Sequence, residues 1–249
     1  MKRQIIGYSV LGLLAYLLFL AWTFPADRAL VLLRPQLPAL QMSGVTGTVW
    51  SGRAATLHYH NQRFSRLTWQ FQPLALFKAQ PTLTITFAGD GRTGTADVGL
   101  RPDGTIVIEE AKAQLPMVEL SQQLGIPVSL GGVVDVAMDK ITINNSVVQG
   151  AEGKLQWRDA SMTAPVLQKL GAFNIQVTTE DAGIKALIND AGGPLQLEGT
   201  ARLINDGTYQ FSAKAAVRDA QQTLLQQALQ AAGRPESDGR ILIEYHGRL

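Results

Sequence analysis

Apolar and polar residues alternate strictly along several stretches that follow residue 42, and this period of two is typical of β-strands with one buried face. In residues 82–87, leucine, isoleucine and phenylalanine alternate with threonine. The same alternation occupies residues 195–203 and 208–215, and it recurs with one interruption at 241–245. One apolar and one polar face in each strand predict a mainly β fold of curved antiparallel sheets, packed on one side only.

Turn signals separate these strands at intervals that suit hairpins. Asp103-Gly104, Asn144-Asn145 and Asn205-Asp206-Gly207 each lie between two strand-like runs. Asn, Asp and Gly tolerate the positive φ that tight hairpin turns require. The segment 89–94 fits the spacing G-x-G-x-x-G, but residues 95–100 after it read as a strand, whereas a dinucleotide site needs a helix there. We therefore interpret this segment as a glycine-rich hairpin.

One or two short helices interrupt the strands. Residues 115–124 predict a helix that has Pro116 in its first turn and ends before a Gly-x-Pro segment. Residues 218–232 predict a clearer one, because leucines and alanines form a stripe at helical spacing and Gly233 supplies a stop signal. The stripe suits packing on a sheet, and docking of a partner helix is the alternative.

The N-terminal segment differs from the rest, because Ile5 to Phe24 contains no charged residue. Twenty helical residues at 1.5 Å each match a hydrocarbon core of about 30 Å, so the segment predicts a transmembrane anchor. Lys2 and Arg3 precede it, and the positive-inside rule then places the N-terminus in the cytoplasm. A signal peptide cleaved after Ala26 is the alternative, although its apolar run would be shorter, at about 7–15 residues.

The chain therefore divides into an anchor and one outer domain. A strand that ends in Leu-x-Trp occurs at both 67–69 and 155–157, which suggests two similar halves within the outer domain. The predicted parts are a cytoplasmic tip (1–4), the anchor (5–24), a linker (25–42) and a β-rich domain (43–249) whose halves divide near residue 130.

Composition narrows the function classes. Apolar residues make up 46% of the chain and charged residues 17%, so a folded domain is expected rather than disorder. A net charge of +2 without basic clusters argues against a nucleic-acid partner. The absence of cysteine excludes disulfides, thiolate catalysis and thiolate metal sites.

Candidate chemistry is sparse. His58 and His60 share one strand face, but the third histidine, His246, is remote in sequence, so a metal site lacks ligands. The acidic pairs at 109–110 and 180–181 point to opposite strand faces and therefore form no dyad. No G-x-S-x-G nucleophile elbow is present. We expect no enzymatic activity, no catalytic residue, no cofactor and no metal.

Several motifs, in order along nearly the whole chain, resemble the type II secretion system protein N family of Gram-negative bacteria. The first is Gly-Val-Thr-Gly-Thr-Val-Trp-Ser-Gly-Arg-Ala at 44–54, and others occupy 67–74, 153–157, 192–200 and 233–249. The motif positions are Gly44, Gly47, Trp50, Gly52, Trp69, Trp157, Gly193, Pro194, Gly239 and Gly247.

This resemblance implies a single-span inner-membrane protein with a cytoplasmic N-terminus and a periplasmic domain. It implies an accessory, non-enzymatic role in type II secretion. The implied partners are other inner-membrane components of the machinery, protein C foremost, and the membrane itself through residues 5–24. The glycine and tryptophan motifs are then expected to mark packing and turns rather than a binding site.

A second hypothesis belongs to another class of function. One-sided apolar sheets on a membrane anchor also suit a lipid-binding or lipid-transfer protein with an apolar groove, as in the AsmA-like proteins. The two hypotheses differ in whether the apolar strand faces are closed, by the helix at 218–232 and a second sheet, or left open as a trough. The sequence leaves both open.

Overall fold

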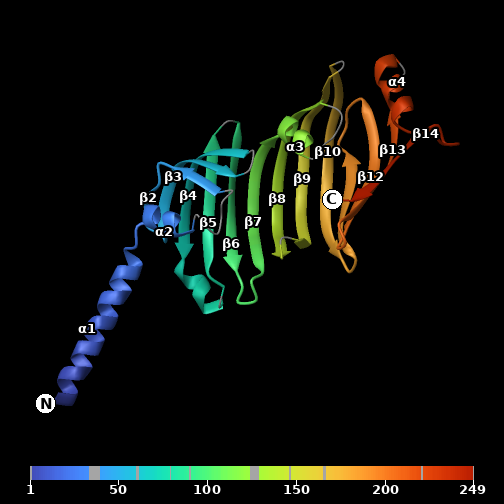
Figure 1. Ribbon diagram of the computed structural model, residues 1–249. Helices are drawn as coiled ribbons and strands as arrows, with labels where there is room; N and C mark the ends of the chain where they lie inside the picture. The colour runs from blue at the N-terminus through green and yellow to red at the C-terminus, as the bar shows by residue number, and fades with distance from the viewer. Residues whose placement is uncertain are drawn as a thin grey trace.

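The computed structural model describes residues 2–33, 40–59, 62–78, 80–89, 91–123, 129–145, 147–164, 167–219 and 221–248. Its strands form a single 15-stranded antiparallel sheet, where the sequence predicted sheets in the plural. The sheet extends from β1 at the α1 end to β14 at the other (Figure 1). The strands are β1 (Leu40–Ser43), β2 (Thr46–Gly47), β3 (Ser51–Tyr59), β4 (Gln62–Gln72), β5 (Thr82–Gly89), β6 (Arg92–Leu100), β7 (Ile106–Pro116), β8 (Ser129–Asn144), β9 (Val147–Ala164), β10 (Gln168–Glu180), β11 (Gly183–Asp190), β12 (Leu195–Ile204), β13 (Thr208–Val217), β14 (Arg234–Pro235) and β15 (Ile241–Arg248).

From β3 to β13 each strand pairs with the next one in sequence, so the sheet is a long meander. The predicted turns produce this order. Asp103 and Asp206 each accept a backbone N–H two residues later, from Thr105 at 2.9 Å and Thr208 at 2.8 Å. The turn predicted at Asn144-Asn145 is also present, and β5 and β6 form the predicted glycine-rich hairpin. These local predictions are confirmed.

The predicted alternation gives the sheet one apolar face along its whole width. Cross-strand pairing aligns Phe71 with Leu83 and Leu83 with Val98 near one end. Leu197, Ala215 and Ile241 are aligned in the same way near the other end. Because side chains alternate between faces, this register places the apolar residues of consecutive strands side by side.

The two predicted internal helices are present but begin later than expected. The first, α3, spans Met117–Gln123, because Leu115 and Pro116 belong to β7 and pair with Val134 and Val133. Pro116 is therefore the last residue of a strand and not part of the helix. Leu124 lies outside the described residues.

The second, α4, spans Thr223–Ala232. The prediction began it at Arg218, but the Arg218 backbone N–H donates to the carbonyl of Pro194 at 2.9 Å. The chain is therefore still paired with the β12 side of the sheet at Arg218, and the first helical bond, from the Gln226 N–H to the Gln222 carbonyl at 3.1 Å, comes later. The predicted end, before Gly233, is confirmed.

The N-terminal residues form α1 (Lys2–Trp22), which extends away from the sheet, followed by α2 (Ala26–Leu33) (Figure 1). A short 3₁₀ helix, η1 (Pro73–Lys78), follows β4. Within the described residues, no helix combines the length and the apolar character that a membrane span requires. The anchor expected over residues 5–24 therefore stays a prediction.

Candidate interaction surface

The apolar face is covered at the C-terminal end of the sheet by α4. Leu225 and Leu229 of the helix are buried against Phe173, Leu195 and Ile241. Burying a leucine side chain stabilises by about 1.5–3 kcal/mol, so these two residues hold the helix on the sheet. Packing on the sheet, rather than docking of a partner helix, is therefore what the apolar stripe of α4 does.

A second cover, α3, lies over β7 and β8. Its Glu119 pairs with Arg92 of β6 at 2.5 Å, and the Arg92 guanidinium lies 5.6 Å from the ring centroid of Phe64. Phe64 in turn meets Phe87 edge-to-face, with centroids 5.2 Å apart. These contacts join the helix to the β4–β6 side of the apolar face.

Between these covers the apolar face lacks a second layer in the part of the chain that the structure describes. Val177 of β10 and Ala186 of β11 lie side by side on this face and are only half-buried. Ala201 of β12 continues the same row and is also half-buried. Of the two arrangements that the sequence left open, the structure shows the open one at these strands.

At the opposite end of the sheet, aromatic residues join α1 to β3 and β4. The Trp50 indole stacks on Trp22 with centroids 5.9 Å apart and meets Phe71 edge-to-face at 4.8 Å. Its N–H donates to the carbonyl of Ala21 at 2.8 Å. The motif residue Trp50 therefore connects the N-terminal helix to the sheet.

The other two motif tryptophans make similar contacts in separate hairpins. Trp69 of β4 donates its indole N–H to the carbonyl of Thr48 at 3.1 Å. Trp157 of β9 donates to the carbonyl of Gly131 at 3.0 Å and packs on Phe173. Neither strand ends at its tryptophan, because β4 continues to Gln72 and β9 to Ala164. The division into two similar halves near residue 130 stays a prediction.

The motif glycines and proline occupy turns and close contacts. A Cβ atom on Gly52 would lie 2.4 Å from Cζ2 of Trp69, so the indole can pack there only on a glycine. At Gly247 it would lie 2.5 Å from the Tyr209 hydroxyl. Gly44, Gly47, Gly193, Pro194 and Gly239 lie in turns or at short strand ends, dispersed along the chain. Gly47, Gly52 and Trp69 meet at the start of β3 and line a hollow of about 520 Å³, but the structure does not bring all the motif residues together into one site.

The candidate metal ligands are not grouped in the part of the chain that the structure describes. No group of three or more His, Cys, Asp or Glu side chains there is arranged to hold a metal ion. His58 lies in β3 and is exposed, whereas His60 lies outside the described residues. His246 lies in β15, at the other end of the sheet order. The expectation that the chain is not an enzyme stays a prediction.

Carboxylates on the sheet serve ion pairs. Asp190 at the end of β11 pairs with Arg218 at 2.6 Å, and its side chain is 10% exposed. Burial raises the pKa of Asp190, but the hydrogen bonds from Arg218 and from the backbone of Gly192 and Leu197 outweigh it, so the pKa lies below its usual value. Asp190 thus connects the β11–β12 turn to Arg218, the residue that follows β13.

A hydrogen bond from Arg158 holds the pKa of Asp135 below its usual value in the same manner. Asp135 and Arg158 lie on β8 and β9, and Gln114 of β7 donates to the same carboxylate at 2.7 Å. Three adjacent strands are therefore connected on the polar face.

The two outer strands of the sheet are short, and they leave backbone groups unpaired. β14 pairs only with Ile241 and Leu242 of β15, so residues 243–248 have no strand partner on that side among the described residues. Glu236 donates its N–H to the carbonyl of Arg240 at 2.8 Å, so the backbone groups of Arg240 point toward the β14 side. Backbone groups alternate between the two sides of an antiparallel strand. Those of Glu244, His246 and Arg248 therefore face the open edge.

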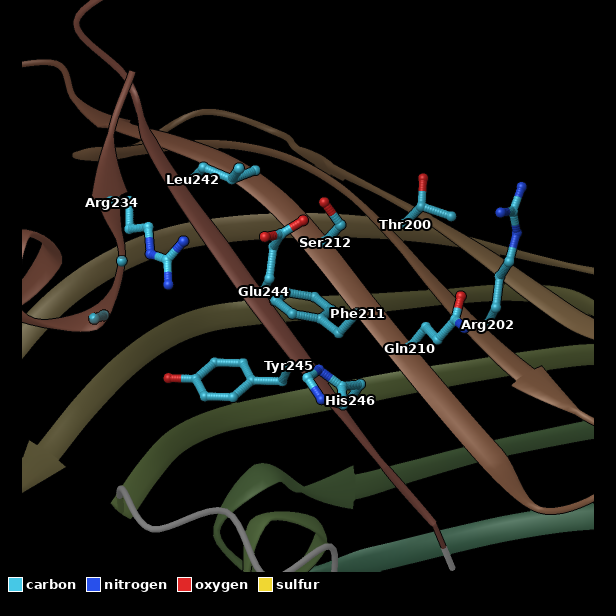
Figure 2. A pocket seen from close by; sticks show the side chains of 12 residues that line it. Thr200, Arg202, Gln210, Phe211, Ser212, Arg234, Leu242, Glu244, Tyr245 and His246 are labelled. Atoms are coloured by element: carbon cyan, nitrogen blue, oxygen red, sulfur yellow. The ribbon is translucent and has the colours of Figure 1, made fainter.

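Beside this edge lies a hollow of about 530 Å³. In Figure 2, the side chains of Thr200, Ser212 and Glu244 point upward from β12, β13 and β15, and Arg234 of β14 lies to their left. Arg202 and His246 also line it. The sequence does not reveal this hollow or the open edge, because no local pattern distinguishes an outer strand from an inner one.

Comparison with known proteins places the chain in a family. The family model for type II secretion system (T2SS) protein N matches residues 38–244. Type II secretion system protein N of Aeromonas hydrophila is 27% identical, with both chains covered completely. The protein of the same name from Vibrio cholerae is 25% identical, also with complete coverage, and that of Pectobacterium carotovorum is 23% identical over 95% of this chain and 94% of the relative.

No solved structure matches this chain. The family match extends over most of the described sheet, and it agrees with the resemblance carried by the glycine and tryptophan motifs. The chain therefore belongs to the type II secretion system protein N family and is a component of type II secretion.

Proposed function

We propose that this chain is a non-enzymatic accessory component of the inner membrane, where its periplasmic domain acts on other inner-membrane components of the type II secretion machinery. Membership of the protein N family supports a role in the type II secretion machinery. The single observation that supports the mode of action is an open antiparallel sheet carried at the end of one N-terminal helix (Figure 1).

The uncharged run in α1 supports the membrane anchor. Leu11, Leu13 and Phe19 of this helix are exposed, at 64%, 59% and 65%, and make no core with the sheet. Apolar side chains exposed on all sides of a helix require an apolar environment. Lys2 and Arg3 at its start support a cytoplasmic N-terminus, and the proposed anchor would then carry the sheet on the periplasmic side.

Docking by strand addition suits the β1 edge. β1 is the outer strand at the end where α1 joins, so a sibling protein tethered to the same membrane would meet this edge first (Figure 1). An extended segment that pairs with β1 gains backbone hydrogen bonds without needing a deep pocket. Tethering both partners to one membrane raises their effective concentration. Protein C is the partner that we place here.

Photo-crosslinking in secreting cells tests this proposal. A benzoylphenylalanine at Gln41 of β1 should give an adduct with protein C, whereas the same residue at Thr178 on the polar face of β10 should not. Deletion of the protein should lower both the release of secreted enzymes and the level of the partner. Equal labelling at the two positions, or normal secretion after deletion, would contradict the proposal.

A second candidate function is lipid binding, and the uncovered apolar face favours it. The row through Val177, Ala186 and Ala201 has neither a second sheet nor α4 above it in the described residues. An acyl chain laid along this row would exclude water from apolar surface, which stabilises by roughly 25 cal/mol per Å². The apolar face would then be a trough for one lipid.

Adjacent residues of β10 supply a matched test, because they point to opposite faces. A benzoylphenylalanine at Val177 should label phospholipid in membranes of cells grown with radioactive phosphate, and one at Gln176 should not. Labelling at neither position, or equally at both, would count against the trough. The outcome is independent of adducts at Gln41.

A further inference from the structure

We propose that two copies of the chain join through the open edges of β15, as an antiparallel pair with His246 opposite His246 of the second copy. The sheets of the two copies would then be continuous across a two-fold axis. Such a contact uses the same patch on both copies, which is the usual geometry of a homodimer. The inference does not rest on the proposed function, which uses the β1 edge at the opposite end of the sheet.

The backbone of β15 sets which registers are available. Glu244, His246 and Arg248 direct their N–H and C=O groups to the open edge, as shown by the alternation from Arg240. Two such strands exchange hydrogen bonds when edge-facing residues lie opposite one another. Centring the pair on His246 achieves this, and it confines the contact to residues 244–248, clear of Ile241 and Leu242, where β14 already pairs.

In this register, the charged side chains of β15 in one copy face opposite charges on β15 of the other copy. Glu244 falls opposite Arg248 of the second copy, and Arg248 falls opposite Glu244 of the second copy. Both side chains are exposed and lie on the polar face. Opposite charges in directly facing positions stabilise a strand pair by about 0.2–1 kcal/mol each, and like charges destabilise it.

Neighbouring registers are less suitable. Moving the pairing so that Glu244 lies opposite His246 requires Leu242, whose edge β14 occupies. A further move in that direction places Glu244 opposite Glu244 of the second copy, which is unfavourable. Moving the other way sets Arg248 opposite His246 of the second copy and so removes both Glu244–Arg248 pairs. The register centred on His246 is the one in which edge, charge and β14 agree.

The apolar face gives a second complementary pair. Tyr245 is 56% exposed, although its ring stacks on Phe211 at 6.4 Å. In the proposed register it lies opposite Gly247 of the second copy. Tyr209 already covers Gly247 within one copy, so Tyr245 of the second copy would lie against the Tyr209 ring rather than on the glycine itself. The pair would therefore cover exposed aromatic surface at both ends.

The hollow of Figure 2 provides room for this contact on the polar face. It is lined by Glu244 and His246 of the edge and by Arg234 from β14. Polar side chains of the second strand, pointing to the same face, would enter it. A contact of five residues per chain is smaller than a standard interface of about 1,600 Å², so we expect a weak dimer whose population depends on concentration.

Because the chain contains no cysteine, a single introduced cysteine reports this geometry cleanly. His246→Cys in the full-length protein should form a disulfide-linked dimer when native membranes are oxidised, since facing Cα atoms lie about 5.5 Å apart. Gln210→Cys, on the same face of the adjacent strand β13, is the matched control and should stay monomeric. Dimers of equal yield at both positions would overturn the proposal.

Charge exchange tests the register. In sedimentation of the full-length protein in detergent, Glu244→Arg and Arg248→Glu should each weaken the dimer about tenfold, because each creates two like-charge pairs. The double variant restores opposite charges and should return the dissociation constant to near the original. A monomer at all concentrations, or no rescue in the double variant, would refute the proposal. A His246→Cys adduct with another protein instead of itself would also refute it and assign the edge to that partner.

Discussion

The indole ring of Trp50 stacks on that of Trp22, with centroids 5.9 Å apart and planes inclined by 19°. Trp50 belongs to the segment that leads into β3, and Trp22 is the last residue of α1. The Trp50 N–H also donates to Ala21, one residue earlier in α1. Two residues that lie 28 positions apart thus fix the angle at which the helix meets the sheet.

Replacing Trp50 should loosen this junction. Trp50→Leu removes the stack and the hydrogen bond, and we expect a loss of about 1–3 kcal/mol in the free energy of unfolding, with faster proteolysis near residues 22–26. Trp50→Phe keeps a ring and should lose about half as much. Denaturant unfolding and limited proteolysis of the full-length protein measure both effects. Unchanged cleavage in Trp50→Leu would show that the junction is held by other contacts.

Gly52 should not tolerate alanine. The added Cβ would approach Trp69 at 2.4 Å and the carbonyl of Thr46 at 2.7 Å, so the indole or the strand must shift. We expect Gly52→Ala to destabilise by about 1–3 kcal/mol, as in other overpacked sites, and to change the tryptophan fluorescence. Gly12→Ala in α1 meets no atom within 4 Å and is the control, with no loss expected.

The helix α4 should detach when its apolar contacts are reduced. Leu229→Ala leaves a cavity in the cluster with Phe173 and Leu195, and we expect a loss of about 2–5 kcal/mol. Hydrogen exchange of residues 223–232 should rise more than that of β8 and β9. Gln226→Ala, on the exposed side of the same helix, should change neither quantity beyond about 0.5 kcal/mol. Equal exchange in the two variants would contradict the assignment of α4 as a cover.

Acid should weaken the protein partly through Asp190. Its pKa in the folded state lies below the usual value of about 3.9 for an unfolded chain, so its contribution is present above pH 4 and is lost as the pH falls through the folded pKa. At pH 7 Asp190→Asn should be less stable than the original protein, and the difference should shrink toward pH 3. Unfolding free energies measured from pH 3 to 7 test this.

Arg218→Gln supplies the paired control for Asp190→Asn. Because the two side chains share one ion pair, the double variant should lose little more than either single variant at pH 7. Full additivity of the two losses would show that Asp190 is stabilised by the backbone of Gly192 and Leu197 rather than by Arg218.

The amino-acid sequence alone determined the mainly β class, several of the strands and hairpin turns, and the presence of two internal helices. Alternation at 82–87 and Asx-Gly turns such as Asp206-Gly207 act within a few residues, so no tertiary contact is needed to read them. The order of motifs from Gly44 to Gly247 likewise indicates the family, because it depends on residue identities alone.

Only the tertiary structure decided how these elements combine. A strand with one apolar face has the same pattern in a sandwich and in a single sheet, so the pattern cannot say whether a second layer covers Val177. The late start of α4 arises because sheet pairing continues to Arg218, whose N–H bonds to the carbonyl of Pro194, 24 positions away. The open edge at Glu244 and His246 arises because β14 stops after two residue pairs. Contacts between residues distant in sequence decide which parts of the apolar face are covered, where the helices begin and which strand edges stay open. Local periodicity does not encode these contacts.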